Sequence, residues 1–342
     1  MLATLVMGVF WALWGGCLMA FGMAWNPMGM DMGRSMSFSM TPATPGSARN
    51  ASVSGLGLVD SVAREVDVTA VDTWTGVVNL GATAEGNIQV PVGGKWLSLI
   101  EVACDWDADN TPIGGLAGMA GIRLSGNAIT KGGTHNYVCS AFSIAGHTSG
   151  GAGARSPKAV LPMRVEMTPS NTLKIEAIMM GEDVGAVTVR VAVSFTQNPR
   201  AGGIEDGDFR EGDLTAVDTW TACTYIGATN EGSFKVPIGF SNLAAVGIVA
   251  AVDAGDLAAS VRAGVIARLT GNGLATGGAF SFLNDGMTLN VVTTGMACCV
   301  DDVDQNAVDL AVKPGNVITA EVMITGEDPG AMNAAVQLFW GE

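Results

Sequence analysis

The sequence predicts an all-β protein made of two consecutive copies of one sandwich domain, with an apolar helix ahead of them. Three observations carry this prediction. A stretch of seven residues occurs twice, at 69–75 and 215–221, and related residues continue in register after it. Apolar and polar residues alternate along several segments, as half-buried strands require. The first 25 residues, by contrast, contain no charged side chain.

The amino-terminal segment is an apolar run over residues 2–25. As a helix it would be about 36 Å long, enough to cross a hydrocarbon core of about 30 Å. The first basic residue is Arg34, whereas a secretory signal peptide opens with positive charge. We therefore predict a retained helix over residues 1–25, facing a membrane or buried against protein. A cleaved signal peptide is the alternative.

Residues 26–64 are predicted to form an arm rich in Met, Gly, Ser and Pro. Methionine at alternate positions is one arrangement for binding soft copper ions, but no His or Cys stands beside these residues. We interpret the arm as adaptable apolar chain that packs on a neighbour or on lipid. The methionines are Met28, Met30, Met32, Met36 and Met40.

The two domain copies are expected at residues 65–198 and 214–342. A displacement of 146 relates 81–83 to 227–229, and a displacement of 145 relates 181–183 to 326–328. A register kept over about 125 residues indicates a duplicated domain and not a shared short motif. Residues 199–213 are polar and rich in Gly, so we predict that they form the linker.

Strand patterns fill both copies. Apolar residues alternate with polar ones from Val187 to Phe195, and the second copy repeats the inward set up to Trp340. Eight such segments in about 125 residues predict a two-sheet sandwich, of which the jelly roll is the eight-stranded form. The Gly-Glu-Asp turn before the last strand predicts an antiparallel hairpin. Trp74 and Trp220 are expected as core anchors beside the first strand, and Phe195 and Trp340 as structural residues of the last.

Catalytic patterns are not found in the sequence. It has only two histidines, His135 and His147, which stand in a Gly-rich stretch without a partner and are expected at the surface. Neither a nucleophile elbow nor a phosphate-binding loop occurs. We therefore expect that the chain is not an enzyme and that it needs no cofactor.

Asp105, Asp107 and Asp109 are spaced like the opening carboxylates of a calcium loop. The glycine of an EF-hand is missing, and Leu116 stands where its bidentate Glu would be. A looser calcium site between loops stays a hypothesis beside that of a solvated acidic loop. A second candidate for such a site is the group Asp301, Asp302 and Asp304.

Charge and cysteine content restrict the partners. Lys and Arg number 17 against 32 Asp and Glu, which gives a net charge of -15. Binding to phosphates needs a basic surface, so we expect no direct contact with nucleic acid. None of the six cysteines holds the same place in both copies, so free buried thiols are expected and not an inherited disulfide framework.

Two predicted jelly rolls behind an apolar arm resemble the double jelly-roll major capsid proteins of adenovirus and of tailless, membrane-containing phages and archaeal viruses. The resemblance covers residues 65–342. It implies homotrimers that form pseudo-hexagonal capsomers of an icosahedral virion, an amino-terminal segment against an internal lipid membrane, and minor capsid proteins as partners. In that family the two domains have usually diverged beyond sequence recognition, whereas these copies still align.

Two other functions remain open. A membrane-anchored cell-surface protein of the S-layer, pilus or adhesin type would also combine an apolar helix with two sandwiches. A secreted carbohydrate-binding protein is the third hypothesis, although only two tyrosines occur in the chain.

Overall fold

The structure of the protein is a computed structural model, and it describes residues 53, 55–106, 116–145, 153–154, 158–181, 186–252, 261–283, 287–289 and 304–341. All regular elements in these ranges are β-strands, which confirms the predicted all-β class. None of the described residues belongs to a helix long and apolar enough to span a membrane. The helix predicted over residues 1–25 and most of the arm at 26–64 lie outside the described residues.

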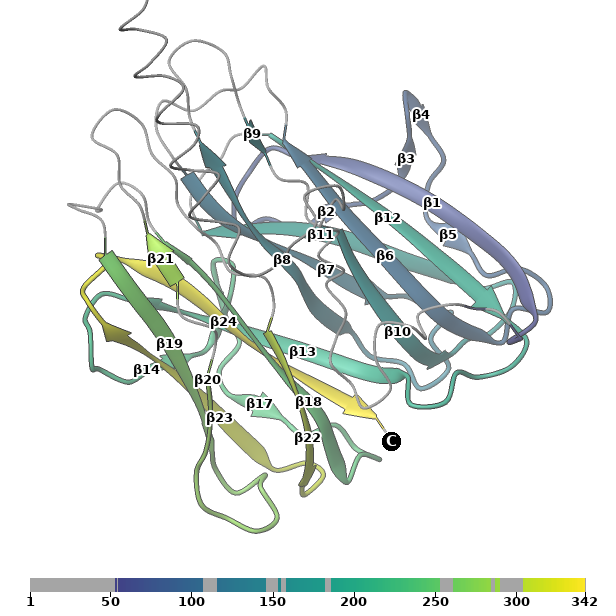
Figure 1. Ribbon diagram of the computed structural model, residues 1–342. Coiled ribbons are helices and arrows are strands. Elements are labelled where there is room, and N and C mark those ends of the chain that lie inside the picture. Colours follow the sequence, from purple (N-terminus) through teal and green to yellow (C-terminus); the bar gives the residue numbers. More distant parts are fainter. Residues whose placement is uncertain are drawn as a thin grey trace, which may run out of the picture. The chain divides into compact units, whose positions relative to one another are not determined.

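The first half of the chain, residues 58–196, contributes to two sheets that enclose one core (Figure 1). Shorter strands β3 (Asn79–Leu80), β4 (Thr83–Ala84), β5 (Ile88–Gln89) and β9 (Gly153–Ala154) pair at their margins. One sheet has the order β1 (Leu58–Val68), β12 (Val187–Thr196), β6 (Trp96–Trp106), β10 (Lys158–Glu166), and the other β2 (Thr75–Gly76), β11 (Thr172–Gly181), β7 (Leu116–Ser125), β8 (His135–Ala145).

The second half, residues 204–341, has the same strand order around its own core. Its shorter strands are β15 (Tyr225–Ile226), β16 (Thr229–Asn230), β17 (Phe234–Lys235) and β21 (Met287–Leu289). One sheet has the order β13 (Ile204–Leu214), β24 (Met332–Gly341), β18 (Asn242–Val252), β22 (Asp304–Ala311), and the other β14 (Thr221–Cys223), β23 (Val317–Gly326), β19 (Val261–Thr270), β20 (Phe280–Leu283).

The segment predicted as a linker, residues 199–213, is mostly strand β13, which pairs with β24 along its whole length. It matches β1 at the displacement of 146: Arg64 Nε donates to the carbonyl of Gly86 at 3.1 Å, and Arg210 Nε to that of Gly232 at 3.0 Å. Strand β1 in turn begins inside the predicted arm, at Leu58. Five carboxylates and two glycines give β13 the composition of a loop, although its backbone forms a full ladder.

The hairpin predicted before the last strand is also corrected. Strand β11 pairs with β7 and β12 with β6 and β1, so the chain crosses from one sheet to the other between them. The same holds for β23 and β24 in the second half. Inward residues such as Ile175 and Val191 meet in one core from opposite sides. Turn composition specifies a reversal of the chain but not the sheet in which the next strand lies.

The last strands of the two halves differ in their outer face. In β12 the inward residues are buried, including Val191 and Phe195, while Arg190 on the other face is exposed. In β24 the inward Trp340 is buried, and so are Ala335 and Phe339 on the opposite face. Strand β24 is therefore covered on both sides.

Phe339 packs in the core cluster of the first half, and a third apolar cluster covers Ala335. It joins the outer face of β7, β8 and β11 in the first half to the outer face of β13, β18 and β24 in the second. The only backbone ladder between the halves in the described ranges is a parallel pair at Met163 and Ile204. The members of this third cluster, which we call the inter-half cluster, are Met119, Val138, Ile178, Met180, Phe209, Ile226, Val249, Ala251 and Ala335.

Candidate functional site: the contact between the two halves

The seven-residue repeat forms the same turn in both halves. Asp72 has a φ of 59° and donates its backbone N–H to the carbonyl of Met179 at 2.7 Å. Asp218 has a φ of 55° and donates likewise to Ile324 at 2.9 Å. Aspartate tolerates this left-handed conformation better than most residues. The repeated sequence therefore specifies a tight turn held to the neighbouring strand.

The tryptophan after each turn lies under an arginine. Arg123 stacks on Trp74 with its guanidinium carbon 4.3 Å from the ring centroid, and Arg268 stacks on Trp220 at 4.1 Å. Both tryptophans are half-buried, whereas core anchors were expected at these positions. A stack of this kind contributes about 0.5–1 kcal/mol at an exposed position.

A glutamate on the neighbouring strand holds each arginine. Arg123 Nη2 lies 2.8 Å from Glu176 Oε2, and Arg268 Nη2 lies 2.7 Å from Glu321 Oε2. Burial raises the pKa of Glu176, but hydrogen bonds from Lys174 and Arg123 outweigh it, so the pKa lies below its ordinary value. The arrangement fixes the turn to the sheet in both halves.

Among the described residues, the turn of the first half is the one that the other half contacts. Gly227, between β15 and β16, lies against it with a φ of +55°, and a Cβ there would come within 2.8 Å of Ile178 Cδ1 and 3.0 Å of Asp72 Cα. The hairpin β15–β16 therefore approaches the first half so closely that only glycine fits. Beside it Ile226 is 6% exposed and belongs to the inter-half cluster.

Glu211 is a buried acid at this contact. It is 6% exposed, and its Oε2 has no hydrogen-bond partner. Burial, and then the negative charges of Asp72 and Asp213, raise its pKa to about 8, although a hydrogen bond with the Gly227 backbone acts the other way. Ionisation of this group in the folded chain is therefore unfavourable at neutral pH.

The corresponding acid of the first half has a basic partner. Glu65 lies opposite Arg190 on the next strand, with Oε2 3.3 Å from the Arg190 Nε. In the second half Ala335 stands opposite Glu211. Alanine at this position has no charge to keep hydrated on the face that the first half covers, and it gives the carboxyl group of Glu211 no cation on the neighbouring strand.

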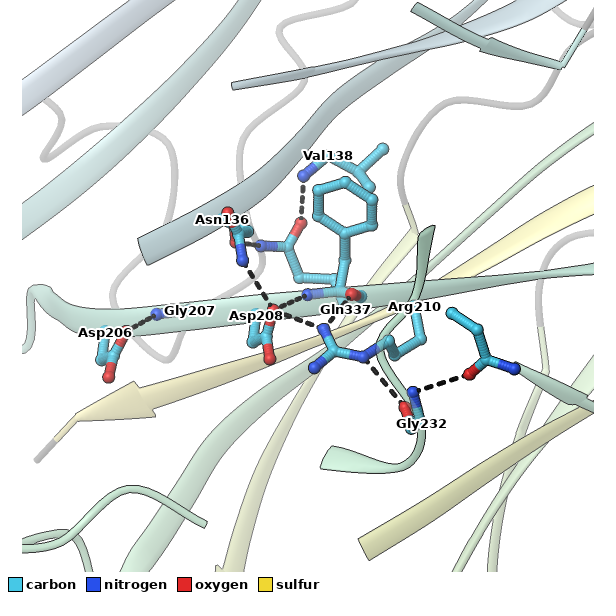
Figure 2. Close-up of polar contacts among 10 residues, drawn as sticks. Asn136, Val138, Asp206, Gly207, Asp208, Arg210, Gly232 and Gln337 are labelled. Atoms are coloured by element: carbon cyan, nitrogen blue, oxygen red, sulfur yellow. Dashed lines mark hydrogen bonds and ion pairs between the residues drawn. The ribbon is translucent and has the colours of Figure 1, made fainter. Parts of the chain in front are cut away.

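Gln337 connects the halves through backbone groups of β8 (Figure 2). Its Oε1 accepts the N–H of Val138 at 2.7 Å, and its Nε2 donates to the carbonyl of Asn136 at 3.1 Å. The side-chain amide takes the place of a neighbouring peptide group. It thus satisfies polar groups of β8 that the contact removes from water.

Asp208 of β13 contacts both Asn136 of β8 and Arg210 of its own strand in Figure 2. Its Oδ1 accepts from Asn136 Nδ2 at 2.9 Å and lies 2.7 Å from Arg210 Nη1. Arg210 also reaches the carbonyl of Gly232 and so holds the base of the β15–β16 hairpin. These contacts use the charged residues of β13 that gave the segment its loop-like composition.

An aromatic pair fills the contact beside this network. The rings of Tyr137 and Phe339 stack with centroids 6.5 Å apart, and the Tyr137 ring leaves no room for a Cβ at Gly207. Burial, and then the carboxylate of Asp206, raise the pKa of Tyr137 well above its usual range. The hydroxyl of Tyr137 has no hydrogen-bond partner.

A pocket of about 200 Å³ lies at the start of β13 and is lined in part by His135, Lys131 and Glu205. Lys131 Nζ is 2.9 Å from Glu205 Oε2, and His135 Nδ1 is 2.7 Å from Asp206 Oδ1, outside hydrogen-bond geometry. His135 is 5% exposed, so its expected surface position is wrong; His147 lies outside the described residues. The charged groups at this pocket tie β13 to the first half.

Of the residues predicted to bind calcium, the structure describes only Asp105 and Asp304. Asp105 pairs with the guanidinium of Arg190, and Asp107 and Asp109 lie outside the described residues. Of the second acidic group only Asp304, in β22, is described. Within the described ranges no three His, Cys, Asp or Glu side chains are grouped to hold a metal ion.

Three cysteines are described, and all are buried free thiols, as expected from the sequence. Burial raises the pKa of Cys104 to about 12 and also raises the pKa values of Cys139 and Cys223. Thiols with raised pKa values are poor nucleophiles at neutral pH. These three cysteines are packing residues.

No protein-family model and no curated protein matches this sequence. Similar solved structures include PNGase F, a glycosylasparaginase from Flavobacterium meningosepticum, with 8% identity, a TM-score of 0.34, and coverage of 81% of this chain and 96% of that one. The major capsid protein P2 of bacteriophage PM2 has 7% identity, a TM-score of 0.31, and coverage of 83% and 98%. A triple jelly-roll protein of an archaeal virus has 11% identity, a TM-score of 0.20, and coverage of 81% and 58%.

These neighbours correct one expectation. From the sequence we expected that the chain is not an enzyme, yet an enzyme, PNGase F, is among the similar structures beside viral capsid proteins. The missing catalytic motifs are therefore no ground for excluding that class. At these TM-scores and identities none of the neighbours assigns a function to this chain.

Proposed function

We propose that this chain is a major capsid subunit, with two jelly rolls in each chain and three chains in a pseudo-hexagonal tile of an icosahedral virion. The strand order supports the jelly-roll part. Each half has eight principal strands, four in each of its two sheets; in the first half they are β1, β2, β6, β7, β8, β10, β11 and β12. Numbered 1 to 8 along the chain, they lie in the order 1-8-3-6 in one sheet and 2-7-4-5 in the other. Such interleaving of early and late strands is what two Greek keys produce in a double-sheet jelly roll.

The observation that carries the proposal is the contact between the halves, which joins two different faces. The first half uses β7, β8 and β11, and the second half uses β13, β18 and β24. A contact of this heterologous type can repeat from one molecule to the next and forms a ring if the rotation closes. Three chains would supply six halves to such a ring.

The same contact between two chains would use the outer face of β20 in the second half of one chain and the outer face of β12 in the first half of the next. Leu283 stands on β20 at the position of Val138 and is 68% exposed. On β12 the exposed Arg190 stands at the position of Ala335 and pairs with Glu65 and Asp105. A contact made from these faces would be more polar than the one inside the chain. That suits subunits which fold separately before they assemble.

The amino-terminal segment belongs to the same proposal as a contact with lipid. Residues 1–25 hold no charged side chain, and a basic arm would be expected in a shell that touches nucleic acid directly. We infer that this segment faces an internal membrane of the virion and that minor capsid proteins join the tiles. Flotation of the full chain with liposomes, compared with a chain that begins at residue 53, tests the lipid contact.

Electron micrographs of the purified full chain test the capsid proposal. Six-sided tiles with threefold symmetry, or closed shells, are expected. Open filaments would mean that the heterologous contact does not close. A continuous planar lattice would favour a cell-surface layer, and particles of single chains at high concentration would overturn the proposal.

A further inference from the structure

The contact inside the chain provides a template for a contact between chains. The β15–β16 hairpin places Ile226 in the inter-half cluster and Gly227 against Asp72 and Ile178. Backbone hydrogen bonds hold its base, because the N–H groups of Glu231 and Gly232 donate to the carbonyl of Thr224 at 2.8 and 3.0 Å. One hairpin tip therefore meets one turn and one strand residue.

The first half has the same hairpin without a partner for its tip. In β3–β4 the N–H groups of Glu85 and Gly86 donate to the carbonyl of Val78, both at 2.9 Å. Gly81 has a φ of +57°, close to the value at Gly227, but nothing lies within 4 Å of a Cβ placed there. Leu80, at the position of Ile226, is 52% exposed. The hairpin is preformed and its apolar tip faces solvent.

The second half has the matching receiving surface. Asp218 lies in the same turn as Asp72 and is exposed, with a φ of 55°. Met323 occupies the place of Ile178 on β23 and is half-buried. Leu283 extends this apolar surface on the neighbouring part of the sheet with 68% of its area exposed. Among the described residues no hairpin covers this surface.

We propose that the β3–β4 hairpin of one chain docks on the surface formed by Asp218 and Met323 of a second copy of this chain. Leu80 then packs on Met323 as Ile226 packs with Ile178, and Gly81 approaches Asp218 as Gly227 approaches Asp72. The inference rests on the proposed trimer and identifies a contact that holds it together. The exposed Leu80 and the half-buried Met323 are both apolar, so burial of one against the other is favourable.

A matched position on the same half serves as a control. Val92 is 85% exposed, and its counterpart Ile238 is 80% exposed. Since neither takes part in the contact inside the chain, the template gives Val92 no role between chains. Val92 is apolar like Leu80 and is the more exposed of the two.

Disulfide trapping between two single variants of the full chain tests the docking. Leu80→Cys mixed with Met323→Cys should give, on oxidation, a covalent species of twice the chain mass. Either variant alone, the wild-type chain, and a mixture of Val92→Cys with Met323→Cys should give none above the background of the native cysteines. A cross-link of Leu80→Cys with itself would contradict the docking, because it would require a symmetric contact.

A charge at the hairpin tip gives an independent measurement. Leu80→Asp should raise the dissociation constant of the oligomer at least tenfold, while Val92→Asp leaves it unchanged, because only the first would place a carboxylate in an apolar contact. Circular dichroism confirms folding of each variant. A trimer that survives Leu80→Asp and gives no cross-link would overturn the docking but not the trimer. A monomeric wild-type chain would overturn both.

Discussion

Replacing Glu211 by Gln isolates the buried carboxyl group at the contact between the halves. Burial, and then the negative charges of Asp72 and Asp213, raise the pKa of Glu211 from an ordinary value of 4.5 to about 8. One pKa unit corresponds to about 1.4 kcal/mol, so ionised Glu211 lowers the free energy of unfolding by about 5 kcal/mol at high pH.

The direction of the pH effect follows from the proton count. Between pH 4.5 and about 8 the folded chain keeps a proton on Glu211 that the unfolded chain has released. The free energy of unfolding therefore falls as the pH rises through this window, and the loss is complete above it. Near the lower limit Glu211→Gln should match the wild type to within about 1 kcal/mol, and above the upper limit it should be more stable by several kcal/mol.

Urea unfolding across this pH range, followed by circular dichroism, measures the difference. Glu65→Gln is the control, because Glu65 holds the same strand position and pairs with Arg190 near the surface. Its effect should stay within about 1 kcal/mol at each pH. Parallel curves for wild type and Glu211→Gln across the window would refute the conclusion that Glu211 is buried without a cation.

Three further substitutions test the fold and its contacts. Gly227→Ala should lower the free energy of unfolding of dissociated chains by about 2 kcal/mol more than Gly81→Ala does. Both substitutions strain a similar φ, but only an alanine at 227 would meet a neighbouring residue. Equal effects of the two in urea titrations would contradict the tight contact. Val191→Asp should prevent folding of the first half, because it places a carboxylate in the core. Arg190→Ala, on the exposed face, should change the free energy of unfolding by less than about 1 kcal/mol. Equal solubility of the two variants would show that the register of β12 is wrong. Arg268→Gln should cost about 1 kcal/mol in thermal unfolding and alter the fluorescence of the tryptophan under it, and an unchanged spectrum would count against the stack.

The all-β class could be predicted because the alternation of apolar and polar residues along a strand is a local property of the sequence. Inward residues such as Val191 and Val336 alternate with others in both copies, and that alternation survives in the structure. Strand β13 was missed because its carboxylates suggest a solvated loop. The signal that identifies it is the displacement of 146 continued upstream, which aligns Arg210 with Arg64.

The contact between the halves could be inferred only by asking where the copies differ. Ala335 and Phe339 replace Arg190 and Ser194 on the outer face of the last strand, and such a change from polar to apolar marks a face that has become covered. What covers it depends on residues far apart in the chain. The unpaired state of Glu211 likewise follows from tertiary packing, and no local pattern indicates it.

The repeated tryptophans illustrate a similar limit. Arginine and glutamate recur with them in both copies, and Arg123 lies directly opposite Glu176 on the neighbouring strand. That pairing is visible in the sequence once the strands are aligned as neighbours. The stacking of the guanidinium on Trp74 needs the turn geometry, which periodicity does not supply.

The mass of the assembled protein tests the proposed capsid tile most directly, because a six-sided tile with two halves in each chain requires three chains. Native mass spectrometry of the full chain, released from detergent, should give three times the chain mass of 34.9 kDa. A single chain mass at every concentration, or an open series of masses without a limit at three, would contradict the account.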